Sequence, residues 1–229
     1  MINIKPNLYS VTVKQYGTDA GADAIGIAAS ADFGSAPDGF KPDDALPGCR
    51  SVVVLGAAFS KDALSGIEEY STSRNEMVTA MTEMANAVAR RIKADGYNSK
   101  AISATGGKWV EKNGRKEQNG HISLKHAAEI AGLGIIGKNY LLTNPRYGNM
   151  LWLSAVLTDA ELTPDERLHS SMCDDCDICV KACPVGALDD PAAFGRNACS
   201  KFYAIEKGKF VIKCFTCRTV CPHRFGIES

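Results

Sequence analysis

Eight of the nine cysteines in this chain of 229 residues fall within one short stretch, between Cys173 and Cys221. Seven of the eight form two runs in which a cysteine recurs at every third or fourth residue and a proline follows the last one. The first run is Cys173-x2-Cys176-x2-Cys179-x3-Cys183-Pro184, and the second is Cys214-x2-Cys217-x3-Cys221-Pro222. Thiols at this density indicate metal or redox chemistry, or else a framework of disulfides.

The start of the chain argues against disulfides. The segment MINIKPNLYSVTVKQYG lacks the charged start and apolar run of a secretory signal. No stretch approaches the roughly 20 apolar residues that a membrane helix requires. We therefore expect a soluble, cytoplasmic protein, in which clustered cysteines bind metal. Basic and acidic residues number 26 each, so no surplus of positive charge indicates nucleic acid binding.

The first run has the spacing of bacterial ferredoxins, in which thiolates hold [4Fe–4S] clusters. Three cysteines at short intervals wrap a loop around one cubane. The fourth begins a helix that leads away, so its thiolate ligates the other cubane. Pro184 suits the first turn of such a helix, because its missing N–H costs little there. The residues expected to hold the first cluster are Cys173, Cys176, Cys179 and Cys221.

The second run matches the last three cysteines of the same signature, and Val211 stands where its first cysteine would be. Cys199 is the only remaining cysteine nearby, and it completes the eight thiolates that two cubanes need. The residues expected to hold the second cluster are Cys183, Cys199, Cys214 and Cys217. Zinc is the alternative, but it requires neither a third cysteine at the same interval nor a proline after both runs. Cys49 stands apart, and we expect a buried, inert thiol.

The rest of the chain predicts an α+β fold. Apolar runs and helical patterns follow one another without the regular alternation of a doubly wound sheet. Short apolar runs rich in β-branched residues predict strands at 24–30, 51–59, 100–104 and 149–157. Helical patterns lie within 1–22, 75–94 and 121–134. We place a boundary near 160–170, which gives a cofactor or substrate domain at 1–165 and a ferredoxin-like domain at 166–229.

The helix at 75–94 shows the clearest pattern. Apolar residues recur along it at three- and four-residue steps, and Gly96 follows as a stop signal. These residues are Met77, Met81, Met84, Val88 and Ile92. The three methionines at helical spacing indicate packing in the core rather than a surface for a cofactor.

A glycine-rich segment imitates two nucleotide-binding motifs. Gly132, Gly134 and Gly137 fit the spelling GxGxxG, and Lys138 and Asn139 nearly complete a phosphate loop. Both motifs follow a strand and open a helix, whereas here a helical pattern precedes the glycines. Asn139 also replaces the hydroxyl that a phosphate loop needs for magnesium. The glycines still indicate backbone with positive φ or a close approach to a ligand, with a tightly packed helix end as the alternative.

Together the two kinds of motif resemble the epoxyqueuosine reductase family and its relatives, the corrinoid reductive dehalogenases. The matching stretches are ALPGCRSVVVLG at 45–56, HAAEIAGLGIIGKNYLLTNPRYGNMLWLSAVLTD at 126–159 and both cysteine runs, the second preceded by ACSKFYAIEKG. The resemblance implies a nitroreductase-like or cobalamin-processing-like N-terminal domain joined to a two-[4Fe–4S] ferredoxin-like domain. It also implies a base-off cobalamin that the clusters reduce. The residues that would lie against this corrinoid are Gly132, Gly134, Gly137, Lys138 and Asn139.

Three features depart from the family's pattern. Where the family has an acid that serves as proton donor, this chain has Gln118-Asn119-Gly120-His121, which includes no carboxylate. The Asp-Tyr-His element before the long helix is matched by Asn75-Glu76-Met77. The chain stops eight residues after Cys221, so it is expected to be a short member without the extension that helps hold tRNA. With balanced charge as well, we do not expect a nucleic acid partner. The catalytic residue stays unidentified, and the candidate acid/base groups are His121, His126, Tyr70 and Glu111.

The sequence therefore predicts a cytoplasmic iron–sulfur oxidoreductase. Electrons would pass from a ferredoxin- or flavodoxin-type donor through two [4Fe–4S] clusters to cobalamin in the N-terminal domain, and then to a small molecule or a corrinoid protein. Two alternatives stay open: a non-catalytic electron-transfer protein that activates a partner, and a tRNA epoxyqueuosine reductase. Flavin is a further alternative for which no residue argues. The substrate, the cluster potentials and the oligomeric state do not follow from the sequence.

Overall fold

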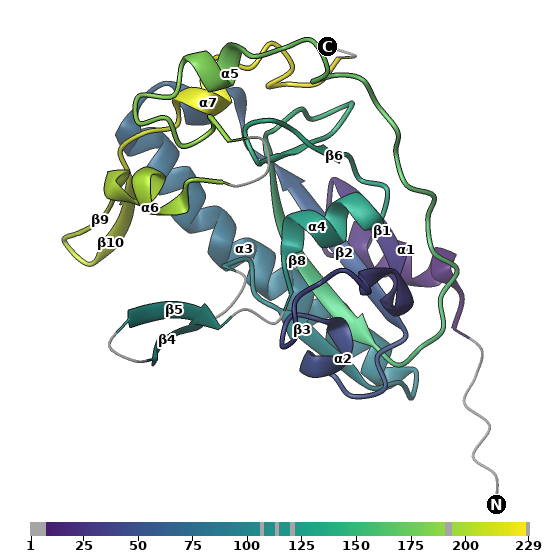
Figure 1. The fold of residues 1–229 in the computed structure, drawn as a ribbon. Coiled ribbons are helices and arrows are strands. Elements are labelled where there is room, and N and C mark those ends of the chain that lie inside the picture. Colours follow the sequence, from purple (N-terminus) through teal and green to yellow (C-terminus); the bar gives the residue numbers. More distant parts are fainter. Residues whose placement is uncertain (1–7, 106–107, 113–114, 120–121, 191–193, 228–229) are drawn as a thin grey trace, which may run out of the picture. The chain divides into compact units, whose positions relative to one another are not determined.

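The computed structural model describes residues 8–105, 108–112, 115–119, 122–190 and 194–227 (Figure 1). The chain forms two compact units, each made of segments that are far apart in the sequence. The sheet unit comprises residues 1–57, 78–133 and 152–167. The cysteine unit comprises residues 58–77, 134–151 and 168–229. The last division thus lies at 167/168, and the cysteine unit also takes two earlier segments that the sequence analysis placed in the first domain.

The sheet unit is built on a four-stranded antiparallel sheet with the strand order β1-β2-β8-β3. Its strands are β1 Ala24–Ala29, β2 Ser51–Ala58, β3 Ser99–Ile102 and β8 Leu151–Thr158. Each lies within two residues of a predicted apolar run, because β-branched residues that are buried on both faces give a continuous apolar signal. An antiparallel sheet agrees with the predicted mixture of α and β structure and not with a doubly wound fold.

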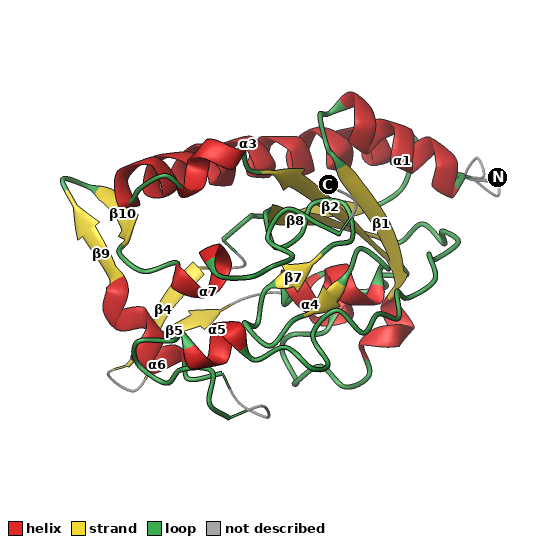
Figure 2. Cartoon of the chain, turned by 90° about the horizontal axis from the view of Figure 1, so that it is seen from above, coloured by secondary structure: helices red, strands yellow, loops and turns green. Residues whose placement is uncertain are grey.

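Helices cover both faces of this sheet (Figure 2). Helix α1 Ser10–Asp19 and helix α3 Ile67–Ala94 lie on one face, and α4 Leu124–Ile130 lies on the other. The shorter elements of the unit are the turns η1 Ser30–Phe33 and α2 Pro42–Ala45 and the hairpin strands β4 Lys108–Lys112 and β5 Arg115–Asn119. The hairpin occupies the polar, turn-rich stretch of the sequence.

Helix α3 is longer than its apolar pattern predicts, since it begins at Ile67 rather than Asn75. The residues added at its start are mostly polar, with Glu68 and Glu69 in the first turn, where acidic side chains stabilise a helix. The side chains of Met81, Met84, Val88 and Ile92 are buried, as predicted for core packing, and Met77 is half-buried. Gly96 follows with a φ of 89°, the left-handed conformation of a helix stop.

The cysteine unit consists of short elements. These are η2 Lys61–Leu64, β6 Ile135–Ile136, β7 Leu142–Thr143, α5 Ile178–Lys181, α6 Arg196–Cys199, η3 Ser200–Phe202, β9 Tyr203–Glu206, β10 Lys209–Ile212 and α7 Thr216–Thr219. From residue 168 onward the only buried apolar residues in the described part of the chain, besides two cysteines, are Ala187, Leu188 and Ile212. This segment therefore buries few apolar side chains of its own.

The start of α3 packs within the cysteine unit through polar contacts. Ser71 Oγ accepts a hydrogen bond from the backbone N–H of Ile212 at 3.1 Å. Asn75 Nδ2 donates to the carbonyl of Phe210 at 2.9 Å. Both partners lie on β10, so the hairpin of β9 and β10 holds the first turns of the helix in place.

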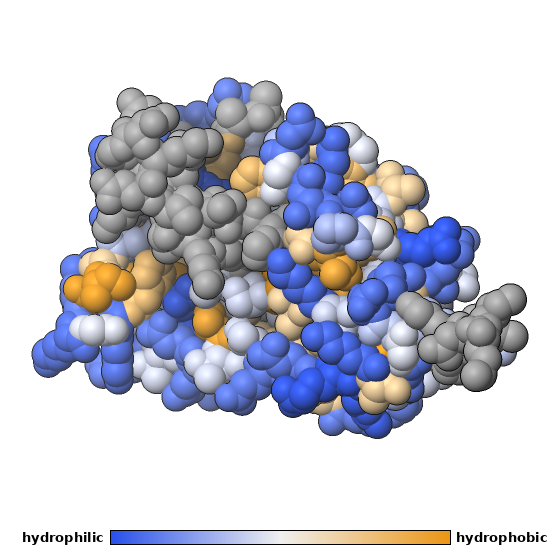
Figure 3. Space-filling view, turned by 90° about the horizontal axis from the view of Figure 1, so that it is seen from below, coloured by the Kyte–Doolittle hydropathy of each residue, from blue (hydrophilic) through white to orange (hydrophobic). Residues whose placement is uncertain are grey.

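Large apolar side chains reach the surface at several described positions. Figure 3 shows one face on which polar and apolar residues are interspersed. The most exposed large apolar residues described are Val11, Ile205 and Tyr9. Among the helices that the structure describes, none combines the length and apolar character needed to cross a membrane.

Candidate functional site

Four cysteines from two parts of the sequence line one small cavity in the cysteine unit. They are Cys173, Cys176, Cys179 and Cys221. The first three lie on the loop that leads into α5 or on α5 itself, and Cys221 follows α7. The structure thus brings together the set that the sequence assigned to one cluster. Their binding of iron stays a prediction.

The charges of neighbouring thiols also affect the pKa of Cys179 and of Cys217. Burial raises the pKa of Cys179, and the charges of Cys221, Cys173 and Cys176 raise it further. Burial raises the pKa of Cys217 to about 11, and the charges of Cys199 and Cys214 act in the same direction. Bare thiolates are therefore disfavoured here, and bound metal would be needed to hold the sulfurs in that form. Cys183, the fourth member expected in the second group, accepts a hydrogen bond from Ala187 N at 3.3 Å.

The four thiols of the first group share a cavity without converging on one point. In the part of the chain that the structure describes, no three His, Cys, Asp or Glu side chains are grouped closely enough to hold a metal ion. A cubane takes one thiolate at each of its four iron corners, so its ligands surround it at a distance from one another.

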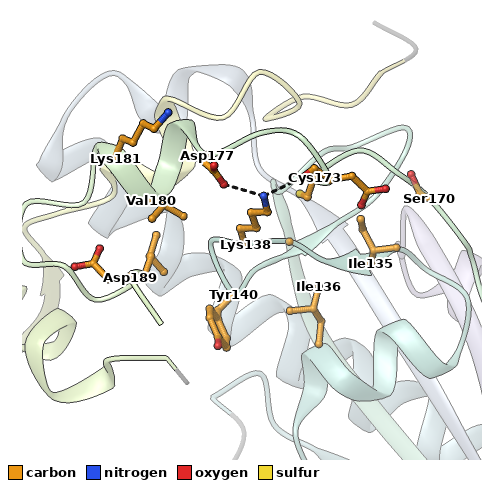
Figure 4. A pocket seen from close by; sticks show the side chains of 13 residues that line it. Ile135, Ile136, Lys138, Tyr140, Ser170, Cys173, Asp177, Val180, Lys181 and Asp189 are labelled. Carbon is orange, nitrogen blue, oxygen red and sulfur yellow. Dashed lines mark hydrogen bonds and ion pairs between the residues drawn. The ribbon is translucent and has the colours of Figure 1, made fainter. Parts of the chain in front are cut away.

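A larger cavity of about 820 Å³ lies beside Cys173 (Figure 4). We call it the acceptor pocket. Its walls come from the glycine segment and from the region around α5, and they include Ile135, Ile136, Lys138, Tyr140, Asp177, Val180, Lys181 and Asp189. The volume lies within the range of about 300–1,000 Å³ that is usual for small-molecule sites. Because Cys173 lines both cavities, a cluster in the first would lie at the wall of the second.

Gly137 explains how the glycine segment approaches the thiols so closely. A Cβ atom at this position would lie 3.1 Å from Thr143 Oγ1 and 3.2 Å from Cys173 Sγ. The Thr143 side chain is buried, and its hydroxyl has no hydrogen-bond partner among the residues described. Glycine therefore leaves a space between a thiol and an unpaired donor. A cluster, whose sulfurs accept hydrogen bonds, fits such a space.

An ion pair connects the two walls of the acceptor pocket. Lys138 Nζ donates to Asp177 Oδ1 at 2.8 Å and to the carbonyl of Asp174 at 3.0 Å (Figure 4). The hydrogen bond to Asp177 raises the pKa of Lys138, and the same bond lowers the pKa of Asp177. Since Asp177 lies between Cys176 and Cys179, Lys138 holds the cysteine loop against the glycine segment.

The other residues predicted to contact a corrinoid have different positions. Gly132, with a φ of 73°, ends α4, where a Cβ atom would collide with the carbonyl of Glu166. A Cβ atom at Gly134 would collide with the carbonyl of Thr143. Both glycines serve tight backbone packing, which was the alternative reading of the motif. Asn139 lines the small cavity and donates to the carbonyl of Cys217 at 3.4 Å. Gly137 and Lys138 are the two that line the acceptor pocket.

The candidate acid/base groups do not line this pocket where the structure describes them. Tyr70 is buried, with its ring centre 5.8 Å from that of Phe59. His126 belongs to the sheet unit, and burial lowers its pKa. His121 and the side chain of Glu111 lie outside the described residues. Cys49 is buried, as predicted, and burial raises its pKa.

The acceptor pocket instead contains a tyrosine that the sequence analysis missed. Tyr140 has a φ of 57°, a conformation uncommon for residues other than glycine. A turn imposes it: Tyr140 N donates to the carbonyl of Gly137 at 2.8 Å, and Gly137 N donates to that of Leu141 at 2.9 Å. The ring stacks on Phe194 with centroids 5.2 Å apart. Residues with such uncommon backbone conformations often lie at functional sites. A positive φ is expected at glycine or asparagine, so a tyrosine in the sequence gives no indication of it.

Comparison with known proteins first defines the class. Residues 167–189 match the family model described as "4Fe-4S binding domain". The site thus belongs to an iron–sulfur protein.

More particular relatives are enzymes named epoxyqueuosine reductase. The chain is 36% identical to that of Bacillus subtilis (strain 168) over 118 residues, which cover 47% of this chain and 30% of the relative. It is 27% identical to that of Gloeobacter violaceus over 202 residues, which cover 80% and 59%. The resemblance found in the sequence is confirmed, and these enzymes are homologues of the chain. The chain spans less than two thirds of the length of either relative.

Solved structures share the fold. One is an epoxyqueuosine reductase crystallised with an epoxyqueuosine-modified tRNA stem loop, with a TM-score of 0.64, 20% identity and coverage of 93% of this chain and 64% of that chain. Another is the catabolic reductive dehalogenase NpRdhA, with a TM-score of 0.70, 19% identity and coverage of 94% and 32%.

Proposed function

We propose that this protein is an iron–sulfur reductase that delivers electrons from [4Fe–4S] clusters to an acceptor held in the acceptor pocket. The observation that carries the proposal is the position of Cys173, which lines both the thiol cavity and the pocket. An electron on a cluster bound by Cys173 would reach the pocket without crossing further protein. A protein that only carries electrons between partners has no need of a ligand-sized cavity there, so the pocket favours an enzyme.

Two clusters are proposed, with the ligands assigned from the sequence. The family match at residues 167–189 supports the cluster type, and the shared cavity supports the first set of four cysteines. The charges of Cys199 and Cys214 act on Cys217, which supports three members of the second set. The charge of Cys179 also affects Cys217, so the two sets are neighbours. Electrons could therefore pass from one cluster to the other.

Cobalamin is the acceptor cofactor that the family resemblance of the sequence implies, and the proposal extends to it. The structure of one solved reductive dehalogenase that shares the fold is described as suggesting a mechanism for B12-dependent dehalogenation. Gly137, Lys138 and Tyr140 are the residues that would lie against the cobalamin, since they line the pocket. When bound, it would supply a metal centre that accepts one electron at a time. Lys138 keeps the pocket wall in place through Asp177, and the apolar side chains of Ile135 and Ile136 limit the access of water.

Reduction of an organic substrate also consumes protons, and Tyr140 is the proposed donor. Its phenol is a proton-bearing group on the pocket wall, held by the turn that follows Gly137. Replacing a general acid typically lowers the rate by about 10²–10⁴-fold. We expect Tyr140→Phe to retain its clusters and to lose activity on this scale once a substrate is identified. Tyr9→Phe, a change at an exposed tyrosine of the sheet unit, is the matched control.

The experiment that tests the proposal is cofactor analysis of anaerobically purified protein. We expect about eight iron and about eight sulfide per chain, as two cubanes require. Addition of cobalamin should give the spectrum of a base-off corrinoid and a stoichiometric complex, and flavin should be absent. A preparation with about one zinc and no sulfide would refute the iron–sulfur assignment. If the protein contains iron–sulfur clusters but does not bind cobalamin, the acceptor of the reductase is a different molecule.

Reduction of epoxyqueuosine in tRNA is a second candidate. The names of the homologues favour it, and so does a related structure that contains a modified tRNA stem loop. Expression of the chain in a strain that lacks its own epoxyqueuosine reductase tests it. Queuosine in the tRNA, measured by mass spectrometry, would support this substrate, provided that a Cys173→Ala variant fails. Persistent epoxyqueuosine with a well-expressed, cluster-containing protein would exclude it.

A further inference from the structure

Arg218 is a buried arginine beside the proposed cluster ligands. Its residue is only 4% exposed, and it follows Cys217 directly on α7. Its Nη1 donates to Asn149 Oδ1 over a long 3.5 Å and lies 3.9 Å from the sulfur of Met150. The guanidinium carbon lies 5.7 Å from the ring centre of Tyr70 and 5.8 Å from that of Phe59.

All of these neighbours are neutral. Within the described ranges of the chain, no aspartate or glutamate forms an ion pair with Arg218. Burying a cation without an opposite charge is costly, and two ring faces and a long hydrogen bond offset that cost only in part. The position therefore calls for a negative partner that is not a side chain.

Lys138 provides the contrast at the first group of thiols. Its ammonium is paired with Asp177, and its side chain is 35% exposed. Both the carboxylate and the solvent therefore weaken its effect on the thiols nearby. Of these two cations, Arg218 is the one whose charge neither a carboxylate nor water balances.

We propose that Arg218 is the countercharge of the cluster held by Cys183, Cys199, Cys214 and Cys217, and that it raises the reduction potential of this cluster above that of the cluster at the acceptor pocket. The inference rests on the proposed function, because it requires both clusters. Four thiolates around a cubane carry a net negative charge, and each added electron makes it more negative. A nearby buried cation stabilises the reduced cluster, since net charge and solvent exposure set these potentials.

The difference between the two reduction potentials sets the order in which the clusters are reduced. A low-potential, one-electron donor of the ferredoxin or flavodoxin type supplies both, and each cluster accepts one. The first electron resides on the cluster beside Arg218. The second occupies the cluster of Cys173, which has the lower potential and is the stronger reductant. The acceptor pocket therefore meets the more reducing of the two clusters, while the other stores an electron.

The test is a redox titration of the whole, cluster-loaded protein, followed by electron paramagnetic resonance. Arg218→Gln removes the charge, Arg218→Lys keeps it, and Arg224→Gln removes a charge from an exposed arginine close in sequence. We expect two couples in the wild type. Arg218→Gln should move the higher couple to a lower potential and leave the other nearly unchanged. Arg218→Lys should restore most of the difference, and Arg224→Gln should move neither couple.

Each outcome decides a separate point. If wild type holds no iron and sulfide, the proposed function fails. If both clusters are present and neither couple moves in Arg218→Gln, or only the lower one moves, the role of Arg218 is refuted. If Arg218→Gln does not retain iron, Arg218→Lys decides: retention of both clusters at nearly wild-type potentials supports a charge requirement. Loss of iron in both variants assigns Arg218 to packing and overturns the inference.

Discussion

The ammonium of Lys138 donates to the carboxylate of Asp177 across 2.8 Å and so connects the glycine segment to the loop of Cys173, Cys176 and Cys179. Lys138 follows Gly137, the residue whose missing side chain leaves space beside the thiol of Cys173. The same short segment therefore both makes room at the proposed cluster and fixes the loop that would bind it.

Breaking this ion pair should loosen the cysteine loop. We expect Lys138→Met and Asp177→Asn each to speed the release of iron to a chelator roughly two- to fivefold, a modest effect because exposed ion pairs contribute little. Absorbance of the iron–chelator complex measures the rate. Lys201→Met, a change at an exposed lysine of the same unit, should release iron at the wild-type rate. Equal rates in all variants would show that the pair does not hold the loop.

Removing a ligand near the end of the chain should remove one cluster. We expect Cys221→Ala to lower the iron and sulfide content from about eight to about four of each per chain, because Cys221 is assigned to the same cubane as Cys173. Chemical analysis of iron and sulfide after anaerobic purification gives the result. Cys49→Ala removes a buried thiol outside both groups, and its iron content should stay at the wild-type level. Full iron content in Cys221→Ala would disprove the ligand assignment.

A methyl group at Gly26 should destabilise the sheet unit. A Cβ atom on this residue of β1 would collide with the carbonyl of Ala131 and lie 2.9 Å from Leu133. Overpacking of this kind costs about 1–3 kcal/mol of unfolding free energy. Gly34→Ala is the control, because its Cβ atom would have open space and its φ of −57° suits alanine. Thermal or chemical unfolding should separate the two variants, and equal stabilities would contradict the packing seen here.

Tyr16 should contribute stability in a pH-dependent way. Its hydroxyl donates to Asp95 Oδ2 at 2.8 Å, and this hydrogen bond raises the pKa of Tyr16 above 10.0. The folded state favours the neutral phenol, so the contribution is complete below pH 10 and is lost as the pH rises through the higher folded value. Tyr16→Phe should cost about 0.5–1 kcal/mol at pH 8, the lower part of the usual range because solvent reaches the pair.

The measurement is thermal unfolding of wild type and Tyr16→Phe between pH 8 and about pH 11, with absorbance of the phenolate as a second observable. The difference in unfolding temperature between the two proteins should disappear at the alkaline end of this pH range. Tyr97→Phe, a half-buried tyrosine of the same unit, controls for the loss of a phenol. A gap that is constant with pH would indicate lost packing rather than the hydrogen bond.

The strands were predictable because their signal is local. The run Val52–Leu55 is apolar and β-branched, and it lies in a buried strand. The same holds for the grouping of Cys173, Cys176 and Cys179 in one cavity, since their short spacing keeps them close together. The start of α3 was missed because its polar residues carry no apolar period. Contacts from Ser71 to Ile212 and from Asn75 to Phe210 hold it, and they join residues more than 130 positions apart.

The acceptor pocket and its tyrosine could not be predicted for the same reason. Tyr140 acquires a positive φ from a turn and a stacking partner in Phe194, neither of which the segment itself indicates. Arg218 reads in the sequence as one more surface arginine. Its burial depends on Asn149 and on the aromatic ring of Tyr70, which come from distant parts of the chain. The packing role of Gly132 and Gly134 was equally hard to predict. The motif alone does not show whether the close neighbour of a glycine is a ligand or a backbone carbonyl.

The interleaving of the cysteine unit has a consequence for how such a protein can be inherited. A self-contained ferredoxin can be cut out and joined to another enzyme as a cassette. Here the residues after Leu168 depend on Ser71, Asn75 and Asn149, which precede them by long intervals. Gene fusion or excision at one point would leave those partners behind. The cysteine segment would therefore have to be transferred together with residues 58–77 and 134–151 to keep these contacts.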